Sequence, residues 1–224
     1  MREAKVLFPT CGPDQSMNRV RVLAYPERSN GMRSCASDRK LAQVKRILSH
    51  ARDGEGIESV DTDVVVRFDN DEFEGQSFGL ALALADKLAR FASEKESQFV
   101  LCATGVLKNQ GQIERVEAFP EKLDLARRTL TPGSMFVFPE DNQWESHDAL
   151  GNLLEAGIIL RSARNLTELG EFWKPPRRSV TQKGQGLSTS HWKPWVAGVL
   201  GISAGFVIPS AIVLAYFLIT GVPK

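Results

Sequence analysis

Ser77 has the surroundings of a serine that could attack a carbonyl group. It stands between two glycines in Gly75-Gln76-Ser77-Phe78-Gly79, and strong helix formers such as Leu and Ala follow it without a break. This pattern predicts that Ser77 lies at or near a helix N-terminus, where free backbone N–H groups and the helix dipole favour developing negative charge. Gly75 and Gly79 would permit a tight turn and the close approach of a substrate chain. The alternative role for Ser77 is that of a plain helix cap.

Lys122 is the candidate general base. It lies in the first turn of the helix that Phe119-Pro120 is predicted to open. Burial and the positive end of a helix dipole both lower the pKa of a lysine from its usual value of about 10.4. A neutral lysine can take the proton of a neighbouring serine as that serine attacks a carbonyl, whereas an ordinary solvated lysine is the alternative. A Ser–His–Asp triad is the weaker prediction, because no recognisable catalytic motif contains His50, His147 or His191.

The elements that must position these two residues alternate between strands and helices. Strands are predicted at residues 20–25, 64–68, 98–105, 135–138 and 158–160, with a hairpin over 106–116. Helices are predicted at residues 39–51, 77–92, 119–129 and, after an Asn165 cap, 166–172. The sequence therefore predicts a single mixed α/β (α+β) domain over residues 1–174.

Charge and cysteine usage argue against several classes of protein. With 28 Lys and Arg against 27 Asp and Glu, there is no electrostatic case for a nucleic-acid partner. Three cysteines without CxxC or Cys/His spacing argue against a disulfide scaffold or a zinc site, and they suit a reducing compartment. The sequence contains no phosphate loop of the form GxxxxGK[ST], so we expect no ATPase in this chain. We also expect no cofactor and no metal.

Four motifs occur in a fixed order along the chain: Gly75-Gln76-Ser77-Phe78-Gly79-Leu80-Ala81, Ala103-Thr104-Gly105, Gly111-Gln112-Ile113, and Glu121-Lys122-Leu123 with Ala126. In this order they resemble the proteolytic domain of Lon proteases, and the flanking elements extend the resemblance over most of residues 15–173. The resemblance implies a Lon-like fold in which Ser77 is the nucleophile and Lys122 the general base. It also implies that the amides around Ser77 are candidates for an oxyanion hole. Thr104 would hydrogen-bond the lysine, or else only satisfy local backbone groups.

The sequence departs from the Lon pattern at three places. Phe78 stands where the family usually has alanine, which would narrow the space beside the nucleophile. Val106 replaces a common glutamate, and Ala118-Phe119-Pro120 replaces the paired glycines ahead of the lysine motif. These changes leave both site residues in place but keep open a second function, a catalytically silent Lon-like domain that acts as a membrane-tethered binding or assembly module. A solvated Lys122, or one far from Ser77, would favour that second function.

The C-terminal part of the sequence has a different composition. Residues 175–194 are rich in Pro, Gly, Ser, Thr and Gln, which predicts a flexible polar linker. Residues 195–222 contain no charged residue, and they exceed the length of about 20 apolar residues that spans a bilayer as a helix. Trp192 and Trp195 suit the interfacial aromatic belt. We therefore expect one C-terminal transmembrane helix; a buried soluble helix is the alternative that this length disfavours.

Charge around the predicted span indicates its orientation. Only Lys224 follows the span, whereas five basic residues precede it: Lys174, Arg177, Arg178, Lys183 and Lys193. By the positive-inside rule the globular domain faces the cytoplasm, and the N-terminus lacks the apolar stretch of a signal peptide. These observations together predict a tail-anchored, ATP-independent serine endopeptidase that hydrolyses protein or peptide substrates.

The same resemblance bears on partners and on processing. Because the chain is expected to lack an ATPase, a separate ATPase or regulatory protein is a candidate partner. Lon-like domains often form rings, which makes a homo-oligomer an expectation. The exposed composition of the predicted linker also makes it a candidate for self-cleavage, which would release the domain from the membrane.

Overall fold

A computed structural model of the chain describes residues 2–11, 15–25, 33–34, 38–55, 63–93, 99–170 and 172. All of them belong to the first of two compact units, Met1–Arg177, and the second unit is Arg178–Lys224. The predicted linker at 175–194 and the predicted transmembrane helix at 195–222 lie outside the described residues. Among the helices that are described, none is both long and apolar enough to cross a membrane.

The first unit contains nine described strands: β1 (Arg2–Thr10), β2 (Ser16–Tyr25), β3 (Arg33–Ser34), β4 (Asp63–Phe68), β5 (Leu101–Ala103), β6 (Val106–Leu107), β7 (Ile113–Glu114), β8 (Met135–Pro139) and β9 (Ile159–Ala163). Seven of them form one sheet in the order β3-β4-β2-β1-β5-β8-β9, and β6 and β7 form a separate hairpin. β2 runs antiparallel to β1 and β4, whereas β1, β5, β8 and β9 are parallel to one another. The carboxyl ends of these four parallel strands therefore meet at one edge of the sheet.

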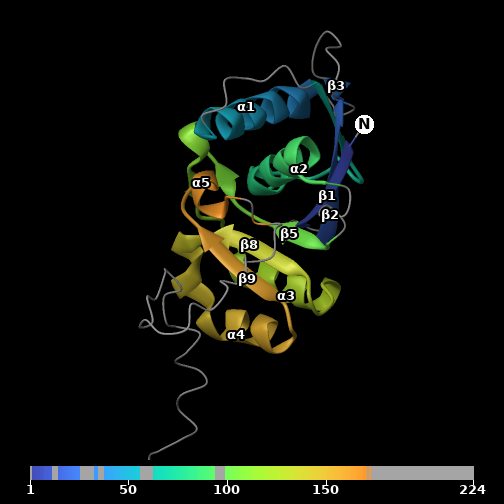
Figure 1. Ribbon diagram of the computed structural model, residues 1–224. Coiled ribbons are helices and arrows are strands. Elements are labelled where there is room, and N and C mark those ends of the chain that lie inside the picture. The colour runs from blue at the N-terminus through green and yellow to red at the C-terminus, as the bar shows by residue number, and fades with distance from the viewer. Residues whose placement is uncertain are drawn as a thin grey trace, which may run out of the picture. The chain divides into compact units, whose positions relative to one another are not determined.

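The helices lie on both faces of this sheet (Figure 1). α1 (Asp38–Gly54), α2 (Gly79–Phe91) and α5 (Leu166–Leu169) pack on one face, and α3 (Phe119–Thr129) and α4 (His147–Glu155) pack on the other. Two short 3-10 helices complete the described elements, η2 (Asn109–Gly111) and η3 (Glu140–Ser146). Neighbouring residues of a strand point to opposite faces, so Val137 joins the core with α1 and α2 while Phe136 and Phe138 join the core with α3 and α4.

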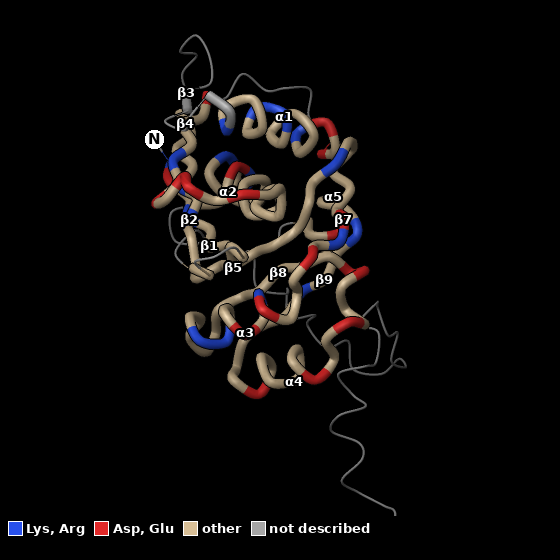
Figure 2. The backbone as a smooth tube through the Cα atoms, turned by 180° about the vertical axis from the view of Figure 1, so that it is seen from behind, with Lys and Arg blue, Asp and Glu red and all other residues tan. Residues whose placement is uncertain are grey.

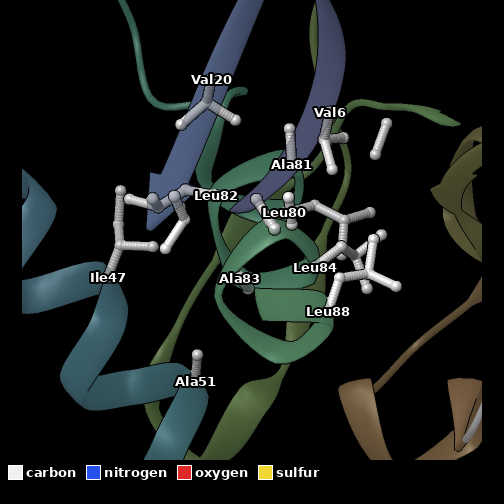
Figure 3. Close-up of a cluster of buried hydrophobic side chains, with 14 of the residues drawn as sticks. Val6, Val20, Ile47, Ala51, Leu80, Ala81, Leu82, Ala83, Leu84 and Leu88 are labelled. Carbon is white, nitrogen blue, oxygen red and sulfur yellow. The ribbon is translucent and has the colours of Figure 1, made fainter. Parts of the chain in front are cut away.

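Helix α2 is the centre of the larger core. Every residue from Gly79 to Asp86 is buried. Figure 3 shows the α2 side chains between Ile47 and Ala51 of α1 on one side and the sheet residues Val6 and Val20 on the other. A helix that is apolar on all sides must be covered on all sides. This explains why the run of Leu and Ala after Ser77 has no polar face.

The mixed α and β architecture predicted from the sequence is confirmed, with shifts at the ends of several elements. The predicted Asn165 cap is also confirmed, because its Oδ1 accepts a hydrogen bond of 2.9 Å from the amide of Thr167. The sequence prediction lacks the strands β1 and β3 and the segment η3–α4. The signal for β1 was the alternation of its buried residues Ala4, Val6 and Phe8. Helix α4 is short, and Gly151 and Asn152 weaken its helical pattern.

A buried ionic network joins the end of α1 to α2, and Figure 2 marks the charged residues of both helices. The Asp86 side chain follows the apolar first half of α2 and has no exposed surface. Its carboxylate accepts hydrogen bonds from Arg52 (2.8 Å) and Arg90 (2.9 Å). Arg90 also pairs with Glu55 at 2.7 Å. A carboxylate can be buried here because two guanidinium groups replace its hydration.

We predict that Asp86→Ala lowers the free energy of unfolding by about 3–5 kcal/mol, since it removes a shared buried counter-charge from Arg52 and Arg90. Asp124→Ala is a matched control, because Asp124 pairs with Arg128 at an exposed i,i+4 position of α3. There the loss should stay below about 0.5 kcal/mol. Urea unfolding of the full chain, followed by circular dichroism, measures both. Equal losses in the two variants would contradict this account of the network.

Candidate active site

Ser77 lies on the turn immediately before α2. The N-cap position of α2 is Phe78, and no side chain caps the helix. Ser77 is half-buried, and its hydroxyl has no hydrogen-bond partner among the described residues. The predicted position near a helix N-terminus is thus confirmed, and the plain-cap role is not the one observed. The hydroxyl is left available for other chemistry.

The end of β5 holds the Ser77 turn through backbone hydrogen bonds. The amide of Gly105 donates to the Ser77 carbonyl at 2.8 Å, and the amide of Leu80 donates to the Gly105 carbonyl at 3.0 Å. A Cβ on Gly105 would lie 3.0 Å from Leu80 Cβ, so glycine is needed for this close approach. The buried Thr104 hydroxyl donates to the Ser77 carbonyl over a long 3.5 Å. The implied bond from Thr104 to the lysine stays a prediction.

Helix α1 holds the residues that lead into the turn. The ammonium of Lys40 donates to the Phe73 carbonyl and lies 3.0 Å from the centroid of the Phe73 ring. Gln43 Nε2 donates to the Gly75 carbonyl at 3.2 Å. Gly75 itself has φ +86°, a left-handed conformation that glycine adopts without strain. The segment before Ser77 is therefore fixed by α1 and the segment after it by β5.

Phe78 points into the core and not beside the nucleophile. It is 1% exposed, and its ring centroid lies 6.0 Å from that of Phe8, 5.5 Å from Phe68 and 5.0 Å from Phe73. The expectation that Phe78 narrows the space beside Ser77 is therefore corrected. These aromatic contacts instead anchor the start of α2 to β1 and β4.

The backbone amides at this turn fall into two groups. The amide of Gly79 donates to the Gln76 carbonyl at 3.0 Å, and the amide of Leu80 is bonded to Gly105. The amides of Ser77 and Phe78 have no acceptor within the part of the chain that the structure describes. Both belong to the N-terminal end of α2, where the helix dipole adds to their positive partial charge. These two amides are candidates for binding an oxyanion.

Lys122 is 5% exposed in the first turn of α3. Its Nζ donates to the Glu117 carbonyl at 2.8 Å, and none of the described carboxylates forms an ion pair with it. Desolvation is the largest influence on its pKa and lowers it from the ordinary value. The neighbouring acidic groups of Cys11, Glu117 and Glu121 act in the opposite direction and raise the pKa of Lys122. Lys122 is thus not the solvated lysine that would favour a silent domain.

The backbone before Lys122 takes a turn that usually needs glycine. Ala118, the N-cap residue of α3, has φ 51° and ψ 41°, in the left-handed region that costs a residue with a Cβ about 1 kcal/mol. Its carbonyl accepts a hydrogen bond from the Lys122 amide at 3.2 Å and a long contact from Cys11 Sγ at 3.9 Å. Ala118 is one of the residues that stand where the Lon pattern has paired glycines. The left-handed turn is therefore present without its usual glycine.

The two site residues are connected to the same edge of the sheet. Thr104, which contacts the Ser77 turn, directly follows β5, and Cys11, which contacts the Lys122 turn, directly follows β1. β1 and β5 are adjacent and parallel, with Leu7 opposite Cys102. The side chains of Ser77 and Lys122 are not hydrogen-bonded to each other in the described structure, and the Lys122 ammonium donates instead to the Glu117 carbonyl.

Sequence reasoning missed three residues that shape this site. Cys11 lies against the lysine turn. The ammonium of Lys40 donates to the loop before Ser77. Asn142 contacts the loop before Lys122 from η3. Each acts through a tertiary contact, and no local pattern in the sequence identifies such contacts.

Comparison with known proteins leaves the family open. Neither a scan against protein-family models nor a search of curated proteins finds a match for this chain. The resemblance to Lon proteases rests on the ordered motifs described above and stays a prediction.

The lowered pKa of Lys122 predicts a specific dependence of stability on pH. Between this lowered pKa and the ordinary 10.5, the unfolded chain binds more protons at Lys122 than the folded chain does. The free energy of unfolding therefore rises with pH in that window. Lys122→Met should remove this contribution, so the stability of the variant relative to wild type should be greatest near pH 7 and decline as the pH approaches 10.5. Urea unfolding across this range measures the difference, and a difference that does not vary with pH would contradict the burial effect.

Proposed function

We propose that this chain is a Ser–Lys peptidase of Lon-like type, in which Ser77 is the nucleophile and Lys122 is the general base. The observation that carries the proposal is the burial of Lys122 in the first turn of α3, where its ammonium donates to a carbonyl and forms no ion pair with any described carboxylate. Desolvation favours the neutral amine, and a neutral amine can act as a base near physiological pH. An ordinary surface lysine is solvated and keeps its ammonium charged at physiological pH.

The proposed reaction follows from the groups around Ser77. Lys122 would accept the hydroxyl proton as Ser77 Oγ attacks the carbonyl carbon of a peptide bond. The amides of Ser77 and Phe78 would bind the oxyanion at the positive end of α2. Lys122 would then return the proton to the leaving amine, and a water molecule would hydrolyse the acyl-enzyme with the same base.

This reaction requires a movement of one side chain. The Lys122 Nζ must leave the Glu117 carbonyl and turn towards the Ser77 hydroxyl when substrate is bound. Hydrogen bonds between catalytic groups are often long or absent without substrate and form in the complex. The bond from Lys122 to Glu117 would thus keep the ammonium in a resting position.

The hydrogen bond from Lys122 to the Glu117 carbonyl also favours a second candidate function, a domain that binds without catalysis. If Lys122 stays on the Glu117 carbonyl with substrate present, Ser77 has no base, and the domain can only bind. This is the catalytically silent binding or assembly module. The two functions share the fold and differ in whether Ser77 forms a covalent intermediate.

We also propose that residues 195–222 anchor the domain to a membrane, with the domain on the cytoplasmic side. Support comes from the uncharged segment and from the basic residues before it. Substrates would then be unfolded or membrane-borne polypeptide segments, because the motif of an ATPase does not occur in the sequence. A separate ATPase and assembly into a homo-oligomer remain part of this proposal.

Cleavage by the full chain in detergent tests the peptidase. Wild type, Ser77→Ala and Lys122→Ala are incubated with unfolded casein and a peptide library, and products are identified by mass spectrometry. We expect each substitution to reduce turnover on the order of 10⁶-fold, as loss of a nucleophile or base does in other serine peptidases. Ser49→Ala and Lys45→Ala, at exposed positions of α1, are the matched controls that should cleave normally. Cleavage unaffected by Ser77→Ala would refute the proposal, and a wild type without cleavage would favour the binding module.

A further inference from the structure

We propose that Asn142 is a positioning residue for the general base, because its buried amide fixes the loop that holds the Lys122 ammonium. The catalytic part of this inference rests on the proposed peptidase function, because the position of Lys122 affects turnover only if Lys122 is the general base. Asn142 comes from η3, which directly follows β8 at the carboxyl edge of the sheet. No pattern in the sequence marks it as part of the site.

The Asn142 side chain binds both backbone groups of one residue. Its Oδ1 accepts from the Val116 amide at 2.8 Å, and its Nδ2 donates to the Val116 carbonyl at 3.0 Å. Nδ2 also donates to Glu145 Oε2 at 3.0 Å. Asn142 has no exposed surface, so these bonds are formed away from water. A side-chain amide has an acceptor and two donors in one plane, and it pairs here with Val116 as a neighbouring strand would.

The loop before α3 connects this clamp to Lys122 residue by residue. Arg115 pairs with Glu145 at 2.6 Å, and Val116 pairs with Asn142. The next two carbonyls, at positions 117 and 118, accept from the ammonium and the amide of Lys122 at 2.8 Å and 3.2 Å. One half of the loop is therefore fastened to η3, and the other half holds Lys122.

The clamp determines where the resting acceptor of Lys122 lies. With the Val116 carbonyl held by Asn142, the peptide plane between Val116 and Glu117 cannot rotate, and the following Glu117 carbonyl stays directed at Nζ. Released from Asn142, the loop could turn this carbonyl away, and the ammonium would move towards water. The lysine would then lose the desolvation that lowers its pKa.

The titratable groups that face Lys122 do not include Asn142, which separates this effect from direct electrostatics. They are Cys11 after β1, Glu117 in the loop and Glu121 in the first turn of α3. Asn142 is neutral, and its hydrogen bonds go to Val116 and Glu145. A neutral replacement of Asn142 neither adds nor removes a charge, so it can change the titration of Lys122 only through the positions of the loop and of the Glu145 side chain.

The test compares Asn142→Ala with Asn18→Ala in the full chain in detergent. Asn18 is also buried, and it clamps another loop, with bonds to the Asn70 carbonyl (2.6 Å) and to the amides of Arg19 (2.7 Å) and Asn70 (3.2 Å). Both variants lose a buried amide, so both should lose stability. Only Asn142→Ala should change the pKa of Lys122. If Asn142→Ala does not fold, Asn142→Ser is the milder neutral variant, because its hydroxyl is too short to reach both groups of Val116.

Two measurements separate the clamp from the peptidase. The first is the titration of Lys122, followed by NMR of protein with ¹³C-labelled lysine and assigned with Lys122→Arg. We expect Asn142→Ala to raise the pKa of Lys122 towards 10.5 and Asn18→Ala to leave it unchanged. The second is the pH profile of kcat, whose ascending limb should move to higher pH in Asn142→Ala, with kcat near pH 8 lower by about 10- to 100-fold.

Each outcome decides between the two claims. A folded Asn142 variant with the wild-type Lys122 titration overturns the positioning role, whatever its turnover. A shifted titration together with a wild type that cleaves nothing supports the clamp and refutes the peptidase. If the pKa of Lys122 shifts but the ascending limb of the pH profile of kcat does not, the effect of Asn142 on catalysis is overturned, because Lys122 would then not be the base.

Discussion

The hydrogen bonds between Gly105 and the start of α2 are the contact on which the proposed site depends. One joins the Gly105 amide to the Ser77 carbonyl, and the other joins the Leu80 amide to the Gly105 carbonyl. They attach the serine turn to the end of β5. Because the first half of α2, Gly79 to Asp86, is entirely buried between α1 and the sheet, the helix cannot shift to relieve a misplaced turn. The position of Ser77 is thus set by the packing of the largest core in the domain.

The lysine side of the site is held by a different kind of contact. The turn before Lys122 contains Ala118 in the left-handed conformation. In the loop ahead of it, the buried side-chain amide of Asn142 pairs with the backbone of Val116 as a neighbouring strand would. Burial of the lysine itself opposes folding, because the charged form loses hydration without a carboxylate in ion-pair contact among the described residues. The ionic network around Asp86 differs in this respect, since every charge there has an opposite charge beside it. The burial of Lys122 without an ion-pair partner among the described residues is what the proposed general base would require.

Local patterns in the sequence predicted the elements that carry the site, but not the contacts that shape it. The helix after Ser77 and the helix containing Lys122 follow from helix formers, glycines and an early proline, all of which act within a few residues. The inward direction of Phe78 depends on Phe8 and Phe68, which lie on strands far away in the sequence. Asn142 follows a strand and a proline, where asparagine is common in turns, and its pairing with Val116 exists only after the fold brings the two segments together. The hydrogen bond from Lys122 to the Glu117 carbonyl could not be predicted from the sequence either, because it depends on the left-handed turn at Ala118.

The most direct measurement is the reaction of the full chain with a fluorophosphonate, which forms a covalent adduct only with an activated serine. Intact mass and peptide mapping would locate the adduct, and labelling would be repeated with Lys122→Met and Asp124→Ala. If Ser77 and Lys122 act together, a single adduct forms at Ser77, disappears in Lys122→Met and persists in Asp124→Ala. Labelling of Ser77 that survives Lys122→Met would contradict the role of the lysine, and the absence of any adduct at Ser77 in wild type would contradict the central claim that this turn carries a nucleophile.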